Sequence, residues 1–195
     1  MKRLLLGATA LTLCAGFSGA AHADFTLNIL HINDFHSRFG PITGSDSNCD
    51  AETDAAGECF GGIARLKTAI DNKRAELEGE NVVLLDAGDQ FQGSLFYTQY
   101  RSEIIAEFAN DLGIEVMAVG NHEFDDGPEE LAKLLEAAEF PIISGNTNVE
   151  NEPALAGKLE GTHVLEIGGE KIGIVSALAE DTDETSSPGE NVEFD

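Results

Sequence analysis

Three hydrophobic runs in this chain each end in a cluster of polar side chains, and this arrangement limits the folds open to it. The runs cover residues 27–32, 82–85 and 116–119, and the clusters follow at 33–36, 86–89 and 120–125. Aliphatic and β-branched runs of this length are typical of buried strands. The sequence therefore predicts three sets of polar side chains at strand ends.

Helical patterns separate these runs. The predicted helices cover residues 63–77, 102–112 and 128–139, and Pro128 is suited to a first helical turn. A further strand is expected at 140–144 and a hairpin at 164–175, around two glycines. Alternating strands and helices predict an α/β fold with a mostly parallel sheet. The polar segment 180–190 is the one candidate linker.

The polar clusters carry metal-binding chemistry. Asp34 and His36 stand two residues apart at a strand end, so in extended geometry both side chains leave the same face. Asp89 follows the next run in a tight turn, where a carboxylate is free to bridge two ions, and Asn121 offers a neutral amide oxygen. Hard oxygen ligands mixed with imidazole suit divalent metals that hold phosphate and activate water.

Each residue taken alone has a commoner explanation. A single Asp after a strand is usually a turn former or helix cap, and a lone His is usually a surface residue. The ordered set at three strand ends favours the metal site. Asp86 is read as structural or as a support for the ligands, His31 as a core or supporting residue, and His163 as structural.

Four aromatic residues follow the Asp89 turn, namely Phe91, Phe96, Tyr97 and Tyr100. They could line a pocket for a nucleoside base, but core packing is the commoner fate of such residues. No base contact is assigned to them.

The ordered set resembles the calcineurin-like metallophosphoesterases, and the flanking runs 85–93 and 121–125 resemble the 5'-nucleotidase family. The resemblance covers essentially the whole chain after its first two dozen residues. It implies two sheets flanked by helices, with this chain supplying about half of a double-sheet sandwich. The family's later Gly-His motifs and its C-terminal nucleotide-binding domain are not found in residues 24–195, so we expect a truncated N-terminal portion of the domain.

The resemblance also implies roles. Asp34 and His36 would hold one divalent ion, Asp89 would bridge two, and Asn121 would hold the second; the ions would be Zn, Mn, Co or Mg. His122 looks like the family's catalytic histidine, a donor to the phosphoryl oxygens or the leaving group.

Asp125 lies three residues beyond His122. It could orient the imidazole and keep it protonated near neutral pH.

The expected function is an exported phosphohydrolase acting on nucleotides, with weak or no activity for this chain alone. Within the same superfamily, cyclic nucleotides, nucleotide sugars or sulfur esters are alternative substrates. Two further alternatives are a catalytically inactive fragment and an acidic exported binding module without metal.

The N-terminus predicts export. Lys2 and Arg3 precede an apolar stretch at 4–17 that is too short to span a membrane, and an Ala-x-Ala cleavage site ends at Ala23. A lipoprotein signal at Cys14 is a poorer fit, because Leu precedes the cysteine. We expect a signal peptide at 1–23, a periplasmic or secreted mature chain, and no stable membrane insertion after cleavage.

Two cysteines remain in the mature chain, Cys49 and Cys59. An even count in an oxidising compartment favours a disulfide over two free thiols. The net charge of −25 argues against nucleic acid polymers and anionic membranes as partners. Two bound cations would still allow a nucleotide substrate.

Overall fold

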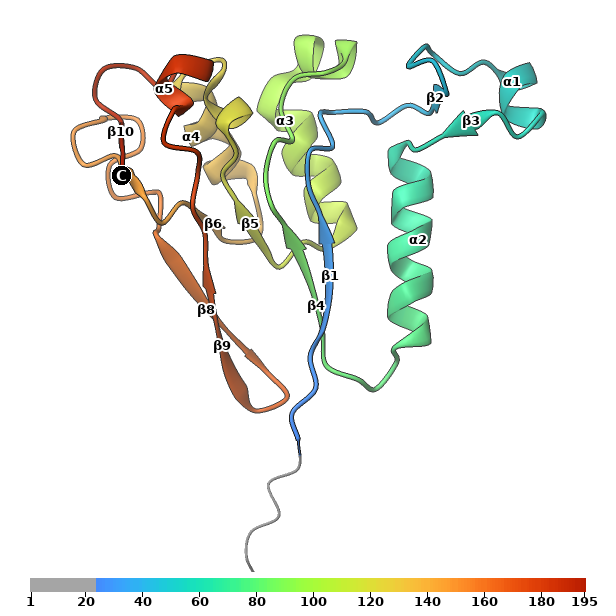
Figure 1. The fold of residues 1–195 in the computed structure, drawn as a ribbon, viewed down its shortest axis with the longest axis horizontal. Helices are drawn as coiled ribbons and strands as arrows, with labels where there is room; N and C mark the ends of the chain where they lie inside the picture. The colour runs from blue at the N-terminus through green and yellow to red at the C-terminus, as the bar shows by residue number, and fades with distance from the viewer. Residues whose placement is uncertain (1–23) are drawn as a thin grey trace, which may run out of the picture.

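The computed structural model describes residues 24–195, and the signal peptide expected at 1–23 lies outside this part. Among the described helices, none has both the length and the apolar character that a membrane crossing needs. Strands and helices alternate along the chain, so the expected α/β fold is confirmed (Figure 1).

A four-stranded sheet forms the centre of the fold, in the order β1-β4-β5-β6. Its strands are β1 Asn28–Ile32, β4 Val82–Asp86, β5 Val116–Ala118 and β6 Ile142–Ile143. All neighbouring strands are parallel, so their carboxyl ends lie at one edge of the sheet. The predicted strands are confirmed, and the three polar clusters meet at this edge.

Three long helices pack with the sheet, namely α2 Ile63–Glu76, α3 Leu95–Leu112 and α4 Pro128–Ala137. Leu84 and Met117 from the sheet and Leu131 and Leu134 from α4 are fully buried in a shared core. Burial of four such side chains contributes roughly 6–12 kcal/mol before the cost of chain entropy. The parallel strands are held in place by this core.

Strand β1 has one covered face and one open face. Leu30 and Ile32 pack against the core, whereas Ile29 and His31 are exposed. His31 is therefore not a core residue. One covered and one open face is the arrangement expected for half of a double-sheet sandwich.

The remaining elements are short, apart from one hairpin. The hairpin pairs β8 Thr162–Ile167 with β9 Glu170–Val175 around Gly168-Gly169, as predicted. Two small antiparallel sheets pair β2 Ile42–Thr43 with β3 Cys59–Phe60, and β7 Thr147–Asn148 with β10 Glu193–Phe194. The short helices are α1 Ala51–Ala55, η1 Asn121–Phe124 and α5 Thr182–Thr185.

Helix α3 begins earlier than predicted. Residues 102–112 form only its second part, and Arg101 interrupts the helix with φ 56° and ψ −145°. The first part starts after Ser94, whose side chain accepts a hydrogen bond from the Phe96 N–H. A cap of this kind supports a helix that has no long apolar repeat.

The segment predicted as a linker is in fact packed. Thr182, the first residue of α5, is fully buried, and Val192 beyond it is 6% exposed. The Phe194 ring stacks edge-on against Phe124 of η1, with centroids 5.7 Å apart. Burial of Thr182 and the contacts of Val192 and Phe194 therefore anchor this polar segment, while most of its other residues stay exposed.

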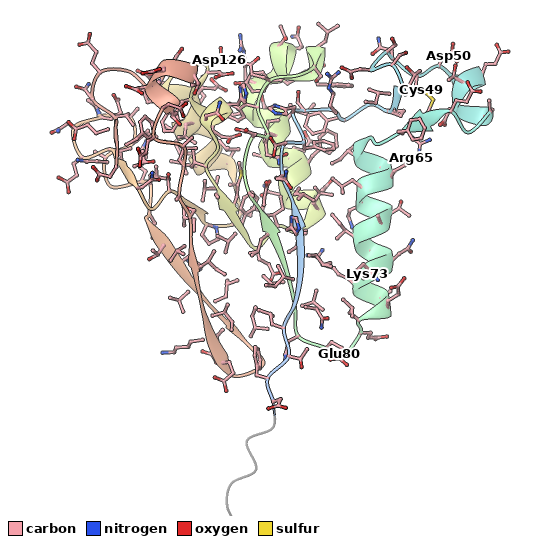
Figure 2. All side chains as sticks on the ribbon, viewed as in Figure 1. Cys49, Asp50, Arg65, Lys73, Glu80 and Asp126 are labelled. Carbon is pink, nitrogen blue, oxygen red and sulfur yellow. A yellow bond between two sulfur atoms is a disulfide. The ribbon has the colours of Figure 1, made fainter. Side chains whose placement is uncertain are left out.

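The disulfide is confirmed. Cys49 and Cys59 are bonded, with their Cα atoms 5.9 Å apart. The bond closes the loop that carries α1 (Figure 2). In this loop, Asp50 accepts a hydrogen bond from the Thr53 N–H at 2.8 Å. This cap and the β2–β3 pairing order the loop.

Candidate metal centre

Backbone hydrogen bonds join the turn after β1 to the turn after β4. The Asp34 N–H donates to the Gly88 carbonyl at 2.9 Å, and the His36 N–H donates to the Asp89 carbonyl at 3.1 Å. These bonds continue the β1–β4 pairing beyond the strand ends. The first two polar clusters are therefore tied to each other through the backbone.

The Glu123 side chain joins the turn after β4 to the turn after β5. Its Oε2 accepts from the backbone N–H groups of Asp89 at 2.9 Å and Gly120 at 2.6 Å. Its Oε1 accepts from those of Gln90 at 2.7 Å and Phe91 at 3.2 Å. Four N–H groups in turns, which no strand or helix satisfies, thus share one buried carboxylate.

The charge of Glu123 is set by opposing effects. Complete burial raises the pKa of the carboxyl above its usual value, and the N–H donors oppose that rise. The donors all converge on the carboxylate, so they favour its ionised form.

Two glycines allow the turns to approach. A Cβ on Gly88 would lie 2.5 Å from the Gly120 nitrogen, and a Cβ on Gly120 would lie 2.5 Å from the Asp89 nitrogen. No side chain fits at those distances. Gly88 also has φ 92°, which other residues rarely adopt.

Unusual backbone conformations gather in the same turns. Seven non-glycine residues in the described part have positive φ, and five of them lie in the turns after β1 and β4, namely Asp34, His36, Ser37, Asp89 and Gln92. Such conformations persist where the surroundings impose them, often at functional sites. Here the inter-turn hydrogen bonds supply that constraint.

Three potential metal ligands converge in this region. His36, Asp89 and His122 each offer an atom within 4.8 Å of the others. The Nδ1 of His36 lies 3.0 Å from the Phe91 carbonyl oxygen, which can only accept, so in the neutral ring Nδ1 carries the proton and Nε2 keeps its lone pair. An imidazole lone pair beside a carboxylate fits a divalent metal ion.

His122 is held differently. Its Nδ1 lies 2.7 Å from the Asp125 Oδ2, and its ring is edge-on to that of His36 with centroids 4.9 Å apart. Partial burial lowers the pKa of His122, but Asp125, Asp89 and Glu123 outweigh this effect and raise it. The structure therefore brings together His122 and Asp125 as the sequence predicts.

The other two predicted ligands lie beside this group. An Asp34 carboxylate oxygen is 3.9 Å from the His36 Nε2, and the Asp34 side chain is 58% exposed. Asn121 is the first residue of η1, and the next backbone N–H, that of His122, donates to Asp89 Oδ1 at 3.0 Å. Asp34 thus borders the His36–Asp89–His122 group, and Asn121 directly precedes His122 in the chain.

Asp86 has a structural position. Its Oδ1 accepts from the Gly88 N–H at 3.0 Å and from the Gln90 amide at 2.9 Å, while its buried Oδ2 has no partner among the described residues. Burial raises the pKa of Asp86 to about 8, helped by the negative charges of Glu123 and Asp34. Asp86 therefore stabilises the turn after β4 through these two hydrogen bonds.

The remaining residues named from the sequence lie elsewhere or in the core. Phe91 and Tyr97 are fully buried, while Phe96 and Tyr100 are about half exposed. His163 lies in β8, 3.7 Å from a carboxylate oxygen of Glu160.

Sequence reasoning assigned no role to Glu123, although this residue lies inside the third cluster. A glutamate three residues after a helix N-cap commonly accepts the N–H of the cap residue, here Gly120. That spacing could have predicted the hydrogen bond from the Gly120 N–H to Glu123. The three bonds to the Asp89 turn depend on tertiary structure.

Comparisons with known proteins agree with this geometry. A family model described as calcineurin-like phosphoesterase matches residues 27–190. The chain is 42% identical over 175 residues to the 5'-nucleotidase of Homo sapiens, covering 87% of this chain and 29% of that protein. It is also 42% identical over 166 residues to an apyrase of Tabanus yao, covering 85% and 29%.

The crystal structure of a 5'-nucleotidase precursor from Thermus thermophilus has the same fold, with a TM-score of 0.76 and 38% identity. It aligns over 87% of this chain and 32% of that one. The chain belongs to the calcineurin-like phosphoesterase family, whose members are hydrolases that use divalent metals. It spans less than a third of the length of each of these relatives.

Replacing Glu123 with Gln should lower the free energy of unfolding by about 3 kcal/mol. An amide nitrogen cannot accept hydrogen bonds, so two of the four buried N–H groups lose their acceptor. Urea denaturation of both proteins measures the change. Glu107→Gln is the control, because Glu107 is exposed on α3; an equal effect of the two substitutions would contradict the role of Glu123.

Asp86 should make stability depend on pH. Between about pH 4 and the folded pKa of about 8, the unfolded chain has lost the Asp86 proton while the folded chain keeps it. Wild type should therefore lose stability relative to Asp86→Asn as pH rises through this window, by at most about 1.4 kcal/mol per pH unit.

Urea denaturation of the metal-free chain at several pH values gives the comparison. Asp111→Asn, at an exposed position, should follow wild type. Parallel pH curves for wild type and Asp86→Asn would show that the Asp86 pKa is not raised.

Proposed function

We propose that this chain supplies part of the two-metal centre of an exported phosphohydrolase of the 5'-nucleotidase type. The observation that carries the proposal is the convergence of His36, Asp89 and His122 at the carboxyl ends of parallel strands. Family membership supports hydrolysis of a phosphate ester, and relatives named 5'-nucleotidase support a nucleotide substrate.

Four residues would hold the metals. His36 directs its free Nε2 lone pair away from the Phe91 carbonyl, and Asp34 lies beside that nitrogen. Asp89 lies between the other two turns and would bridge the ions, while Asn121 would hold the second. When bound, divalent ions activate water for attack on phosphorus and offset the charge on the phosphoryl oxygens.

His122 would act as a proton donor rather than a ligand. Asp125 accepts the hydrogen bond from Nδ1, and the raised pKa of His122 favours the imidazolium, which has no lone pair for a metal. The imidazolium can donate its other N–H to a phosphoryl oxygen or to the leaving oxygen. The contrast between His36 and His122 thus follows from what each Nδ1 contacts.

The cellular location is part of the proposal. A disulfide between Cys49 and Cys59 is typical of proteins in an oxidising compartment, which supports a periplasmic or secreted chain. The net charge of −25 opposes nucleic acid polymers as partners, so the proposed substrate is a free nucleotide.

Residues 24–195 supply few ligands for two ions. Four protein donors cannot fill two shells that each take about five or six, so water would occupy the other positions. The relatives that match are about three times as long. We expect this chain alone to bind metal and to hydrolyse nucleotides slowly, because positioning and charge stabilisation carry most of phosphoryl-transfer catalysis.

The first measurement is metal binding. Mn²⁺ titrated into the metal-free chain and followed by electron paramagnetic resonance should show binding that Asp89→Asn weakens by at least about tenfold. Asp111→Asn should bind like wild type, since Asp111 is exposed on α3. Equal Mn²⁺ affinity of all three proteins would refute the assigned site.

The second measurement is turnover, with adenosine monophosphate, a cyclic nucleotide and a nucleotide sugar as substrates and Mn²⁺, Co²⁺ or Zn²⁺ as the metal. Phosphate release from the monophosphate should be slow and should disappear in Asp89→Asn. Preference for another substrate would change the assignment within the family. Rapid turnover would show that residues 24–195 suffice for catalysis.

A further inference from the structure

The carboxylate that orients His122 has a second partner. Asp125 Oδ2 faces the His122 Nδ1 at 2.7 Å, while Asp125 Oδ1 accepts a hydrogen bond from the Ser186 hydroxyl, also at 2.7 Å. The Asp125 side chain is only 19% exposed. Both of its oxygens are therefore engaged, each by one donor on a different segment.

Ser186 reaches Asp125 from a distant part of the chain. It follows α5, and its own N–H donates to the Thr182 carbonyl at 2.9 Å. Thr182 is fully buried and its hydroxyl donates to the Ala179 carbonyl at 2.7 Å. Ser186 is thus presented by an ordered turn, 61 residues away from Asp125 in the sequence.

The residue after Asp125 is also held by side chains. Asp126 Oδ2 pairs with Arg101 at 2.6 Å and accepts the Tyr97 hydroxyl at 2.7 Å. Figure 2 labels Asp126 at the end of the molecule where α5 lies. These contacts hold the backbone next to Asp125 in place, so the orientation of the Asp125 carboxylate depends on its own two hydrogen bonds.

We propose that Ser186 is a positioning residue, whose hydroxyl fixes the rotation of the Asp125 carboxylate so that Oδ2 faces the His122 Nδ1. The inference rests on the proposed function, because it adds a third member to the His122–Asp125 pair of that site. Which imidazole nitrogen carries the proton depends on the hydrogen bond that the ring makes. A fixed carboxylate therefore keeps the proton on Nδ1 of the neutral ring and leaves Nε2 directed to the reaction.

The test measures which nitrogen of the His122 imidazole carries the proton, without metal or substrate. The chain is labelled with ¹⁵N-histidine and freed of metal, and long-range ¹H–¹⁵N correlations of His122 are recorded at alkaline pH, where the ring is neutral. Wild type should show Nδ1 protonated, and Asp125→Ala should show the resonances of a free side chain. Ser186→Ala should move both nitrogen resonances from the wild-type positions towards those of Asp125→Ala.

Two variants separate positioning from packing. Ser186→Thr keeps the hydroxyl and should therefore show the wild-type resonances. Ser187→Ala is the matched control, because Ser187 is exposed and its side chain makes no hydrogen bond within residues 24–195. Circular dichroism establishes that each variant is folded before it is compared.

The proposal is overturned if Ser186→Ala keeps the wild-type resonances. It is equally overturned if Ser187→Ala moves them as far, or if Ser186→Thr fails to restore them, because the segment would then act by packing alone. None of these readings depends on hydrolysis, so a chain without phosphohydrolase activity can still confirm or refute the role of Ser186.

Discussion

The buried carboxylate of Glu123 is the interaction on which the candidate metal centre depends. A turn that follows a parallel strand leaves backbone N–H groups without partners, and burying them unpaired costs about 1–3 kcal/mol each. Glu123 accepts four such groups, three from the Asp89 turn and one from Gly120. One side chain therefore fixes the relative positions of two turns, and backbone hydrogen bonds from Asp34 and His36 attach the third.

This constraint explains several features that otherwise look unrelated. Gly88 and Gly120 are required because the turns that Glu123 holds are too close for any Cβ. The positive φ angles of Asp34, His36 and Asp89 persist because each residue is bound to a neighbouring turn. The same geometry gives the two histidines different chemistry, since a carbonyl fixes His36 and a carboxylate fixes His122. Strain in the turns and the ligand arrangement are thus two results of one set of contacts.

Much of the fold was predictable from the sequence, because apolar periodicity reflects local burial. That periodicity predicts β1, β4 and β5, and also the helices at 63–76 and 128–137. The elements that were missed depend on distant partners: the first part of α3 is capped by Ser94, and α5 is held by burial of Thr182. For the site, strand-end placement indicated that the turns carrying His36 and Asp89 would meet, and the three-residue spacing indicated the His122–Asp125 contact. It did not predict Glu123 or Ser186 as partners, since neither the bonds of Glu123 to the Asp89 turn nor that of Ser186 to Asp125 has a signal in spacing or composition.

Hydrogen exchange of the Asp89, Gln90, Phe91 and Gly120 amides tests the central claim most directly. These amides lie in turns, where exchange is normally fast, so slow exchange requires the Glu123 carboxylate as acceptor. In the metal-free wild-type chain, the four amides should exchange as slowly as the backbone amides that pair β4 with β1. In Glu123→Gln, at least the two amides that lose their acceptor should exchange faster than those strand amides. Rapid exchange of all four in wild type would contradict the account, because the turns would then be held together by something other than Glu123.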